Sequence, residues 1–190
     1  EKLGNCIYKI GSDDAVNLPL LRYVAQLQKP ILLSTGMCTM SEVGLAVDAV
    51  LGQGNDKLIL LHCVTNYPAA PASVNLLAMA AMERAFGLPT GYSDHVLGND
   101  VAIAAVALGA CVIEKHFTLS RAEKGPDSTF SMEPDELSAL VSETYNASMS
   151  LGTASFDRPD IESGNIVFRR SIYFVKNLKN DLLAVLKHSH

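Results

Sequence analysis

Five short apolar segments recur along the chain, and stretches with helical periodicity separate them. This repetition is the feature that most restricts the fold. Segments this short, apolar on both faces, are typical of strands in a parallel sheet that is covered on both sides. Alternating strands and helices predict parallel pairing, because each strand then starts again from the same end of the sheet. The segments are CIYKI (6–10), PILLS (30–34), KLILLHC (57–63), PTGYS (89–93) and CVIEKH (111–116).

Four helices are predicted between and after these strands. Ser41 and Ser73 are suitable N-caps for the first two, and Gly87 is a suitable residue to end the second. The third helix is expected from about Asn99, and the fourth has Pro134 in its first turn. The order of elements therefore predicts the α/β fold class.

Two parallel architectures fit this order. An open doubly wound sheet gathers its ligands at one topological switch point. A (β/α)8 barrel, of which five units would be present and three strands missing, gathers ligands from the carboxyl ends of many strands. Polar residues follow all five predicted strands, which favours the barrel. These residues are Lys9, Ser12, Asp13, Asp14, Ser34, Thr35, Thr65, Asn66, Tyr67, Ser93, Asp94, His95, Glu114, Lys115 and His116.

Composition excludes some partners and predicts the cellular setting. The 190 residues carry a net charge of −5 and no Lys/Arg-rich run, so nucleic acid is not an expected partner. The longest apolar run, 101–110, is too short to span a membrane, so no membrane partner is expected. Three of the four cysteines lie in strand-like runs, where buried free thiols are expected in a reducing, cytoplasmic setting. Without an initiating Met, the chain is expected to be a piece of a longer protein.

Two histidines stand at the ends of neighbouring predicted strands. Adjacent strands lie about 4.8 Å apart, so His95 and His116 could share one divalent ion, with Asp14 as an oxygen ligand. Alternatively, each histidine is a partly buried residue whose hydrogen bonds are satisfied within the fold. The spacing alone leaves both interpretations open.

A lysine at the first strand end indicates an anion site. Lys9 is costly to bury unless it meets an anion, which could be a ligand phosphate or carboxylate, or else Asp13 or Asp14. Two loop residues are further candidates. Asp127 could bind sugar hydroxyls or be solvated, and Tyr67 could cover the site or pack on the following helix. The hydroxyl groups that could donate to the same anion are those of Ser12, Ser34 and Ser93.

Several motifs together resemble the sialic acid synthase family, and more closely its N-acylneuraminate and legionaminic acid synthase group. The resemblance covers residues 6 to about 176, and its specificity comes from the combination and order of the motifs. The motifs are KIGSDD, KPILLSTGM, LLHCVTNYP, GYSDHVLGNDVAIAAVALGACVIEKHFTL, and GPD with SMEPDEL.

The resemblance implies a TIM barrel followed by a small antifreeze-like (SAF) domain. This chain would supply barrel strands four to eight (1–152), a linker (153–166) and the truncated start of the antifreeze-like domain (167–190). The implied reaction condenses phosphoenolpyruvate with an N-acetylmannosamine-type amino sugar, giving a nonulosonic acid and phosphate. The full-length protein would be a homodimer that uses a divalent metal ion, Mn or Mg.

The family's residue roles transfer by position. His95 and His116 match the metal ligands, and Lys9 and Asp14 match residues at the reacting centre. Asp14 departs from the family pattern, because GSDD replaces the more common GSGE. The residues expected to hold phosphoenolpyruvate or sugar are Lys9, Ser12, Ser34, Thr65, Tyr67, Ser93 and Asp127.

Three groups that the resemblance implies are absent from this chain. The family carries a catalytic Glu and a second phosphate-binding Lys on its first two barrel strands, and its antifreeze-like domain lends an Arg to a partner's active site. The isolated chain is therefore expected to be inactive. Two other functions stay open. One is a related condensing enzyme that uses another aldehyde sugar, and the other is a non-catalytic relative that acts in polysaccharide or coat assembly.

Overall fold

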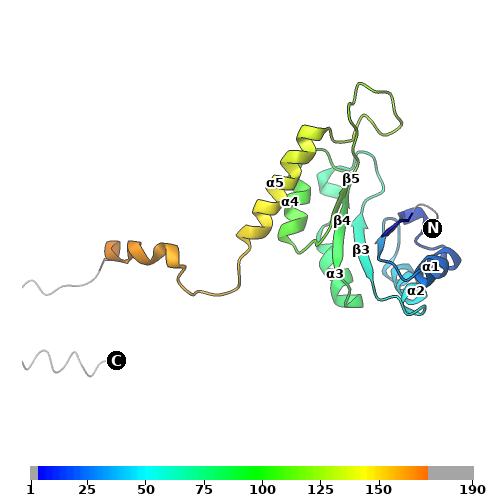
Figure 1. Ribbon diagram of the computed structural model, residues 1–190, viewed down its shortest axis with the longest axis horizontal. Coiled ribbons are helices and arrows are strands. Elements are labelled where there is room, and N and C mark those ends of the chain that lie inside the picture. Colours follow the sequence, from blue (N-terminus) through cyan, green and yellow to red (C-terminus); the bar gives the residue numbers. More distant parts are fainter. Residues whose placement is uncertain (1–3, 171–190) are drawn as a thin grey trace, which may run out of the picture. The chain divides into compact units, whose positions relative to one another are not determined.

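The computed structural model describes residues 4–170 (Figure 1). Contacts divide the chain after Gly152 into two units, and each is described by itself. The first unit alternates strands and helices. Its strands are β1 (Tyr8–Ile10), β2 (Ile31–Ser34), β3 (Leu58–Cys63), β4 (Thr90–Asp94) and β5 (Ile113–Lys115); its α-helices are α1 (Leu18–Gln26), α2 (Met40–Leu51), α3 (Leu77–Phe86), α4 (Asp100–Ala107) and α5 (Pro134–Ser150); and its 3-10 helices are η1 (Ser12–Asp14) and η2 (Pro71–Ser73).

The five strands form one parallel sheet in chain order, β1-β2-β3-β4-β5. The predicted parallel α/β fold is therefore confirmed. A doubly wound sheet reverses its strand order at a switch point, and these five strands show no reversal. Sequential pairing is the order of a (β/α)8 barrel, so the sheet is a half-barrel of five strands, consistent with part of a TIM barrel.

The helix-covered face of the sheet carries the main core. Ile10, Leu33 and Leu60 are buried on this face, in one cluster with Leu21 of α1 and Val50 of α2. Full burial of an aliphatic side chain of this size contributes about 1.5–3 kcal/mol relative to exposure. This packing fixes which face of each strand turns away from the helices.

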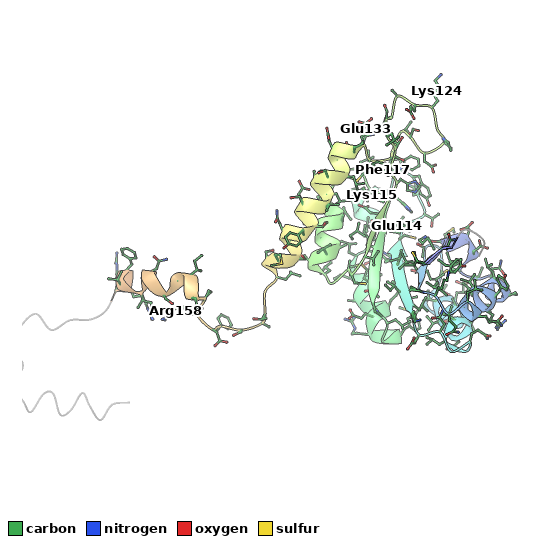
Figure 2. All side chains as sticks on the ribbon, in the orientation of Figure 1. Glu114, Lys115, Phe117, Lys124, Glu133 and Arg158 are labelled. Atoms are coloured by element: carbon green, nitrogen blue, oxygen red, sulfur yellow. The ribbon has the colours of Figure 1, made fainter. Side chains whose placement is uncertain are left out.

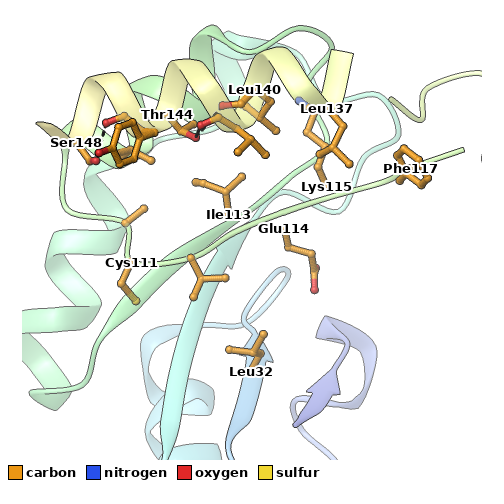
Figure 3. Close-up of a pocket in the computed structure, with 15 residues that line it drawn as sticks. Leu32, Cys111, Ile113, Glu114, Lys115, Phe117, Leu137, Leu140, Thr144 and Ser148 are labelled. Atoms are coloured by element: carbon orange, nitrogen blue, oxygen red, sulfur yellow. Dashed lines mark hydrogen bonds between the residues drawn. The ribbon is translucent and has the colours of Figure 1, made fainter. Parts of the chain in front are cut away.

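The opposite face of the sheet is where polar side chains collect. Register partners on parallel strands point to the same face, and so do residues two apart along one strand. Figure 3 shows this alternation on β5, where Glu114 and Lys115 point to opposite sides of the strand. Following the register from β1 to β5 places one residue from each strand on the inner face, near its carboxyl end. These are Lys9, Ser34, Cys63, Ser93 and Glu114.

Helix α2 starts with a capping box that differs from the predicted cap. The Thr39 hydroxyl accepts from the Glu42 N–H, and the Glu42 carboxylate accepts from the Thr39 N–H. Ser41 lies inside the first turn, so its prediction as N-cap was wrong. The reason is local: three residues after Thr39 stands a glutamate, whereas three residues after Ser41 stands Gly44, which cannot complete the box.

The other helix ends match the sequence in part. Ser73 lies in η2, and α3 starts at Leu77 without a side-chain cap, so this cap prediction was wrong as well. Gly87 ends α3 in the left-handed region at φ 64, as predicted. Helix α1, capped by the side chain of Asn17, was not among the predicted helices. None of the helices within residues 4–170 has the length and apolarity to cross a membrane.

The four cysteines are free thiols, but only one of them is buried. Cys63 lies on β3 inside the sheet, where burial was expected. Cys6 and Cys111 are exposed, which corrects the prediction for these two. They precede β1 and β5, the two strands that have a neighbour on one side only, so less of the chain covers them.

The second unit contains the 3-10 helix η3 (Asp160–Phe168). A linker was predicted over 153–166 and a strand over 167–178. Val167 and Phe168 belong to η3, and Arg169 and Arg170 lie in no strand, so the predicted strand is wrong over 167–170. Its remainder from 171 to 178 lies outside the described residues, and the antifreeze-like domain stays a prediction.

The inner face of β4 has no space for a side chain at Gly91. A Cβ there would lie 2.6 Å from the carbonyl oxygen of Val112 and 2.7 Å from Cδ2 of Leu61. We expect Gly91→Ala to lower the free energy of unfolding by about 1–3 kcal/mol, because the backbone oxygen cannot rotate away. Urea unfolding followed by circular dichroism measures this change.

Gly44→Ala is the matched control for that substitution. Its Cβ would meet only Cε1 of Phe86 at 3.6 Å, an ordinary contact, within helix α2. Ala should therefore stabilise the protein there by about 0.5–1 kcal/mol. Equal stability of Gly91→Ala and wild type would contradict the close packing of β4 against its neighbours.

Candidate active site

A polar cavity of about 370 Å³ lies at the carboxyl ends of the strands. All five strands or the loops that follow them contribute to its wall, which the barrel prediction requires. Most of the predicted site residues line it together. The lining residues are Lys9, Gly11, Ser12, Asp13, Ser34, Met37, Cys63, Thr65, Tyr67, Ser93, His95, Glu114 and His116.

Glu114 connects two of the predicted anion-binding residues. Its Oε1 lies 3.3 Å from Lys9 Nζ and accepts a hydrogen bond from Ser93 Oγ at 2.7 Å. Lys9 on β1 therefore pairs across the half-barrel with Glu114 on β5. The alternative prediction, that Lys9 pairs with Asp13 or Asp14, was wrong. Glu114 follows three apolar residues in CVIE, and period-2 alternation was the signal that could have placed it on the inner face.

The Ser34 hydroxyl is buried in the wall of the same cavity, and within residues 4–170 it has no hydrogen-bond partner. Ser34 is 2% exposed, and its Oγ makes no hydrogen bond. Buried polar groups are normally paired, so an orphan hydroxyl in a cavity wall indicates a missing partner. An oxygen of a bound ligand would satisfy it.

Gly36 lets three side chains converge behind Ser34. A Cβ at Gly36 would lie 2.4 Å from Thr65 Oγ1, 2.8 Å from Cys63 Sγ and 2.8 Å from Ser12 Oγ. The Gly36 N–H donates to Ser12 Oγ at 2.9 Å, and the same oxygen lies 3.0 Å from the Cys63 sulfur. The absence of a side chain at Gly36 thus positions Ser12 and Thr65 at the cavity wall.

One ring nitrogen of His95 makes a hydrogen bond to the backbone, and the other can bind a ligand. Its Nδ1 lies 2.7 Å from the carbonyl oxygen of Val64. A carbonyl only accepts, so Nδ1 carries the proton and the Nε2 lone pair stays free, the form that binds a metal. Burial lowers the pKa of His95, whereas the hydrogen bond to Val64 raises it. The effect of burial is larger, so the neutral ring is favoured.

His116 faces His95 within a cluster of four rings. The two imidazole centroids are 5.4 Å apart, and Tyr67 lies 4.2 Å from His95 and 5.5 Å from His116. Phe130 closes the cluster, 5.6 Å from Tyr67. Tyr67 therefore lies over the histidines in the cavity wall, which agrees with the first of the two positions considered for it. Burial is the largest cause of its raised pKa, so the phenol keeps its proton at neutral pH.

Asp127 lies next to the histidines without lining the cavity. Its Oδ2 is 3.5 Å from His116 Nδ1, and its side chain is 56% exposed. The structure thus places Asp127 at the edge of the ring cluster, where it can reach a ligand that extends outward from the cavity.

Asp14 is not part of the cavity wall, whereas its neighbour Asp13 is. The Asp14 carboxylate accepts from Asn17 Nδ2 at 3.2 Å, beside the start of α1. Both aspartates sit in η1, and sequence alone could not tell which one points inward. Among residues 4–170, no group of three or more His, Cys, Asp or Glu side chains is arranged to hold a metal ion. His95 and His116 lie together in the cavity wall, and Asp14 is not assembled with them as the predicted third ligand.

A larger cavity of about 660 Å³ has a different character (Figure 3). Its wall is mainly apolar and comes from β5 with the residues just before it, and from α5 residues such as Leu137 and Leu140. Figure 2 shows Glu114, Lys115 and Phe117 along this stretch of chain. Because β5 is the last strand of the sheet within residues 4–170, this cavity lies at the edge of the half-barrel.

Comparison with known proteins agrees with this geometry. The sequence profile of the NeuB family matches residues 1–156. The N,N'-diacetyllegionaminic acid synthase of Campylobacter jejuni subsp. jejuni serotype O:2 is 42% identical over 181 residues, which cover 94% of this chain and 54% of that protein. The synthase of the same name from Legionella pneumophila is 44% identical over 175 residues, 90% of this chain and 49% of that protein. The chain thus spans about half the length of these curated relatives.

A solved structure shares the half-barrel. The N-acetylneuraminic acid (sialic acid) synthetase from Leptospira borgpetersenii serovar Hardjo-bovis, crystallised in complex with citrate, superposes with a TM-score of 0.81 at 37% identity. The superposition covers 88% of this chain and 59% of that one. The five-stranded arrangement therefore occurs in a protein of known structure.

The Gly36 packing gives a test of the site's architecture. We expect Gly36→Ala to lower the free energy of unfolding by about 1–3 kcal/mol, because the added methyl group overlaps buried Cys63. Cys63→Ala should relieve part of this overlap, so the double variant should lose less stability than the sum of the single variants. Urea unfolding of all four proteins measures this coupling, and strict additivity would contradict the contact.

Proposed function

The chain belongs to the NeuB family, as its motifs predicted, and on that premise we propose that it forms half of the active site of a nonulosonic acid synthase. The enzyme would join phosphoenolpyruvate to the aldehyde carbon of an N-acetylmannosamine-type amino sugar and release phosphate. The legionaminic acid synthases that the chain resembles support this substrate class.

The observation that carries the proposal is the unpaired Ser34 hydroxyl in the cavity that Lys9 also lines. A buried donor without a partner and a lysine in the same cavity suit an anionic ligand. Phosphoenolpyruvate has a phosphate and a carboxylate, which can accept from several donors at once. Ser12, Thr65 and Ser93 line the same wall and would supply the additional hydroxyl donors.

A divalent ion would be held by His95 and His116, with water and substrate completing its coordination. Oxygen ligands favour a hard ion such as Mn²⁺ or Mg²⁺, whereas imidazole favours a transition-metal ion, so the mixed ligand set suits Mn²⁺ better than Mg²⁺. Bound there, such an ion would act as a Lewis acid toward the sugar aldehyde. The neutral His95 ring, with its proton on the nitrogen facing Val64, is prepared for this role.

The amino sugar would lie against Tyr67 and Asp127. Tyr67 presents a ring and a protonated phenol, and the exposed Asp127 carboxylate can accept from sugar hydroxyls. In the proposed reaction the enol carbon of phosphoenolpyruvate forms a bond to the aldehyde carbon, and water adds at the carbon that bears phosphate. Phosphate then leaves as the ketone forms. Lys9 and the hydroxyls orient the anion throughout.

We expect the other half of the active site to be formed by segments that correspond to the parts of the relatives outside the matched region. The chain spans about half of their length, so we expect the 190 residues alone to have no synthase activity. Dimerisation of the full-length protein also stays a prediction. Asp14 lies outside the cavity wall, which Asp13 lines, so we assign Asp14 no part in the proposed reaction.

Phosphate release tests the proposed reaction. We expect the whole protein to release phosphate from phosphoenolpyruvate only when both Mn²⁺ and an N-acetylmannosamine-type sugar are present. A panel of aldehyde sugars separates this function from a related condensing enzyme. Calorimetric titration with phosphoenolpyruvate separates it from a non-catalytic role in polysaccharide or coat assembly, which predicts no binding.

Substitutions at Lys9 and Ser34 test the anion site. Lys9→Met should reduce kcat/KM for phosphoenolpyruvate by about 10²–10³, the usual cost of removing one strong electrostatic contact. Ser34→Ala should raise the KM for the same substrate. Lys57→Met, which removes a lysine just before β3 at the opposite end of the sheet, should leave both constants unchanged. Equal effects of Lys9→Met and Lys57→Met would rule out the anion site.

A further inference from the structure

Lys115 is a buried lysine whose three ammonium hydrogens are all used. Its Nζ lies 2.6 Å from Asp94 Oδ2, 2.7 Å from the carbonyl oxygen of Val96 and 2.7 Å from that of Gly98. Its side chain is 5% exposed and that of Asp94 is 0% exposed. An ammonium group has three donors, so this arrangement satisfies it completely.

Stability alone is a weak reason for such a pair. Removing two charges from water costs several kcal/mol per ion, and apolar replacements of a buried pair are often equally stable. Elsewhere on the helix-covered face the strands carry mainly apolar side chains, with uncommon polar exceptions such as Thr90 and His62. A buried lysine at this point therefore indicates a positional role.

The pair lies one residue before both histidines. Asp94 on β4 is the register partner of Lys115 on β5, so His95 and His116 are the next residues on their strands. The ion pair lies on the helix-covered face and thus fixes the alignment of the two strands directly behind the imidazoles. An error of one residue in this register would turn each side chain to the other face.

The hydrogen bonds also hold the chain that follows His95. Lys115 binds the carbonyls of Val96 and Gly98, and Asp94 Oδ1 accepts from the Val96 N–H at 2.8 Å. The backbone of His95 itself is also held, because its carbonyl oxygen accepts a hydrogen bond from the Ala69 N–H at 2.8 Å. His95 is consequently held between two anchored segments, with its ring directed by the Val64 carbonyl.

We propose that the Asp94–Lys115 ion pair is a positioning element for the His95–His116 pair. It holds β4 and β5 in register and holds the loop after His95, so that the two imidazoles converge on the cavity. This inference rests on the proposed function only in its metal-binding readout. The arrangement of the rings can be tested without metal and without substrate.

The test uses a neutral double variant, Asp94→Asn with Lys115→Met, in the whole protein. Asn keeps an acceptor for the Val96 N–H, and Met fills the volume of the lysine stem, while the three ammonium hydrogen bonds are lost. Arg121→Met is the matched control, because it removes a cation paired with Glu136 in a more exposed position.

Two readouts distinguish positioning from folding. Long-range ¹H–¹⁵N spectra of histidine report which ring nitrogen of His95 carries the proton. His62, whose Nε2 lies 2.6 Å from the Val74 carbonyl, serves as the internal reference in the same spectrum. Calorimetric titration with Mn²⁺ measures affinity at a temperature where circular dichroism shows a folded protein.

We expect the double variant to unfold cooperatively, to show mixed tautomers at His95 and to lose about 10–100-fold in Mn²⁺ affinity, as is typical when a group that orients a ligand is removed. The spectrum of His62 and the properties of Arg121→Met should stay as in wild type.

A double variant with the wild-type tautomer and Mn²⁺ affinity would overturn the proposal. Loss of cooperative unfolding would also overturn it, because the pair would then serve the fold. If wild type bound no Mn²⁺, the metal part of the proposed function would fail, and the His95 tautomer would still decide the positioning role.

Discussion

Parallel pairing of the strands in chain order is the constraint on which the rest of this structure depends. It brings the carboxyl ends of all five strands to one edge of the sheet, so residues that are far apart in sequence meet there. Lys9 on β1 reaches Glu114 on β5 because the sheet curves as a half-barrel between them. In an open doubly wound sheet these two edge strands would diverge, and no single cavity could include both residues.

The sequence predicted what depends on local pattern. The five strands follow from short apolar runs, and polar residues after each run indicated which end of the sheet carries the chemistry. The sequence could not predict which of two adjacent polar residues faces the cavity. Asp13 and Asp14 are adjacent in a 3-10 turn, and the backbone of η1, which no periodicity encodes, decides which one faces the cavity. The same applies to Glu114, whose role depends on a partner more than a hundred residues earlier.

Caps and loop side chains show a similar division. Thr39 and Ser41 are both good N-cap types, and the choice between them depends on which one has a glutamate three residues later. Tyr67 could have packed on the following helix or over the cavity, and its contacts with two histidines and Phe130 come from separate segments of the chain. Such contacts exist only after the sheet has formed.

Lys9 of β1 and Lys115 of β5 have different surroundings, and the different roles that we propose for them follow from this difference. Lys9 has a side chain that is 33% exposed and one carboxylate partner at 3.3 Å, so a ligand anion can compete for it at moderate cost. Lys115 is 5% exposed and has three short hydrogen bonds, so exchanging its partners would leave buried groups unsatisfied. These surroundings support the proposal that Lys9 exchanges its carboxylate partner for a ligand anion, and the proposal that Lys115 keeps its partners and holds the histidines in position.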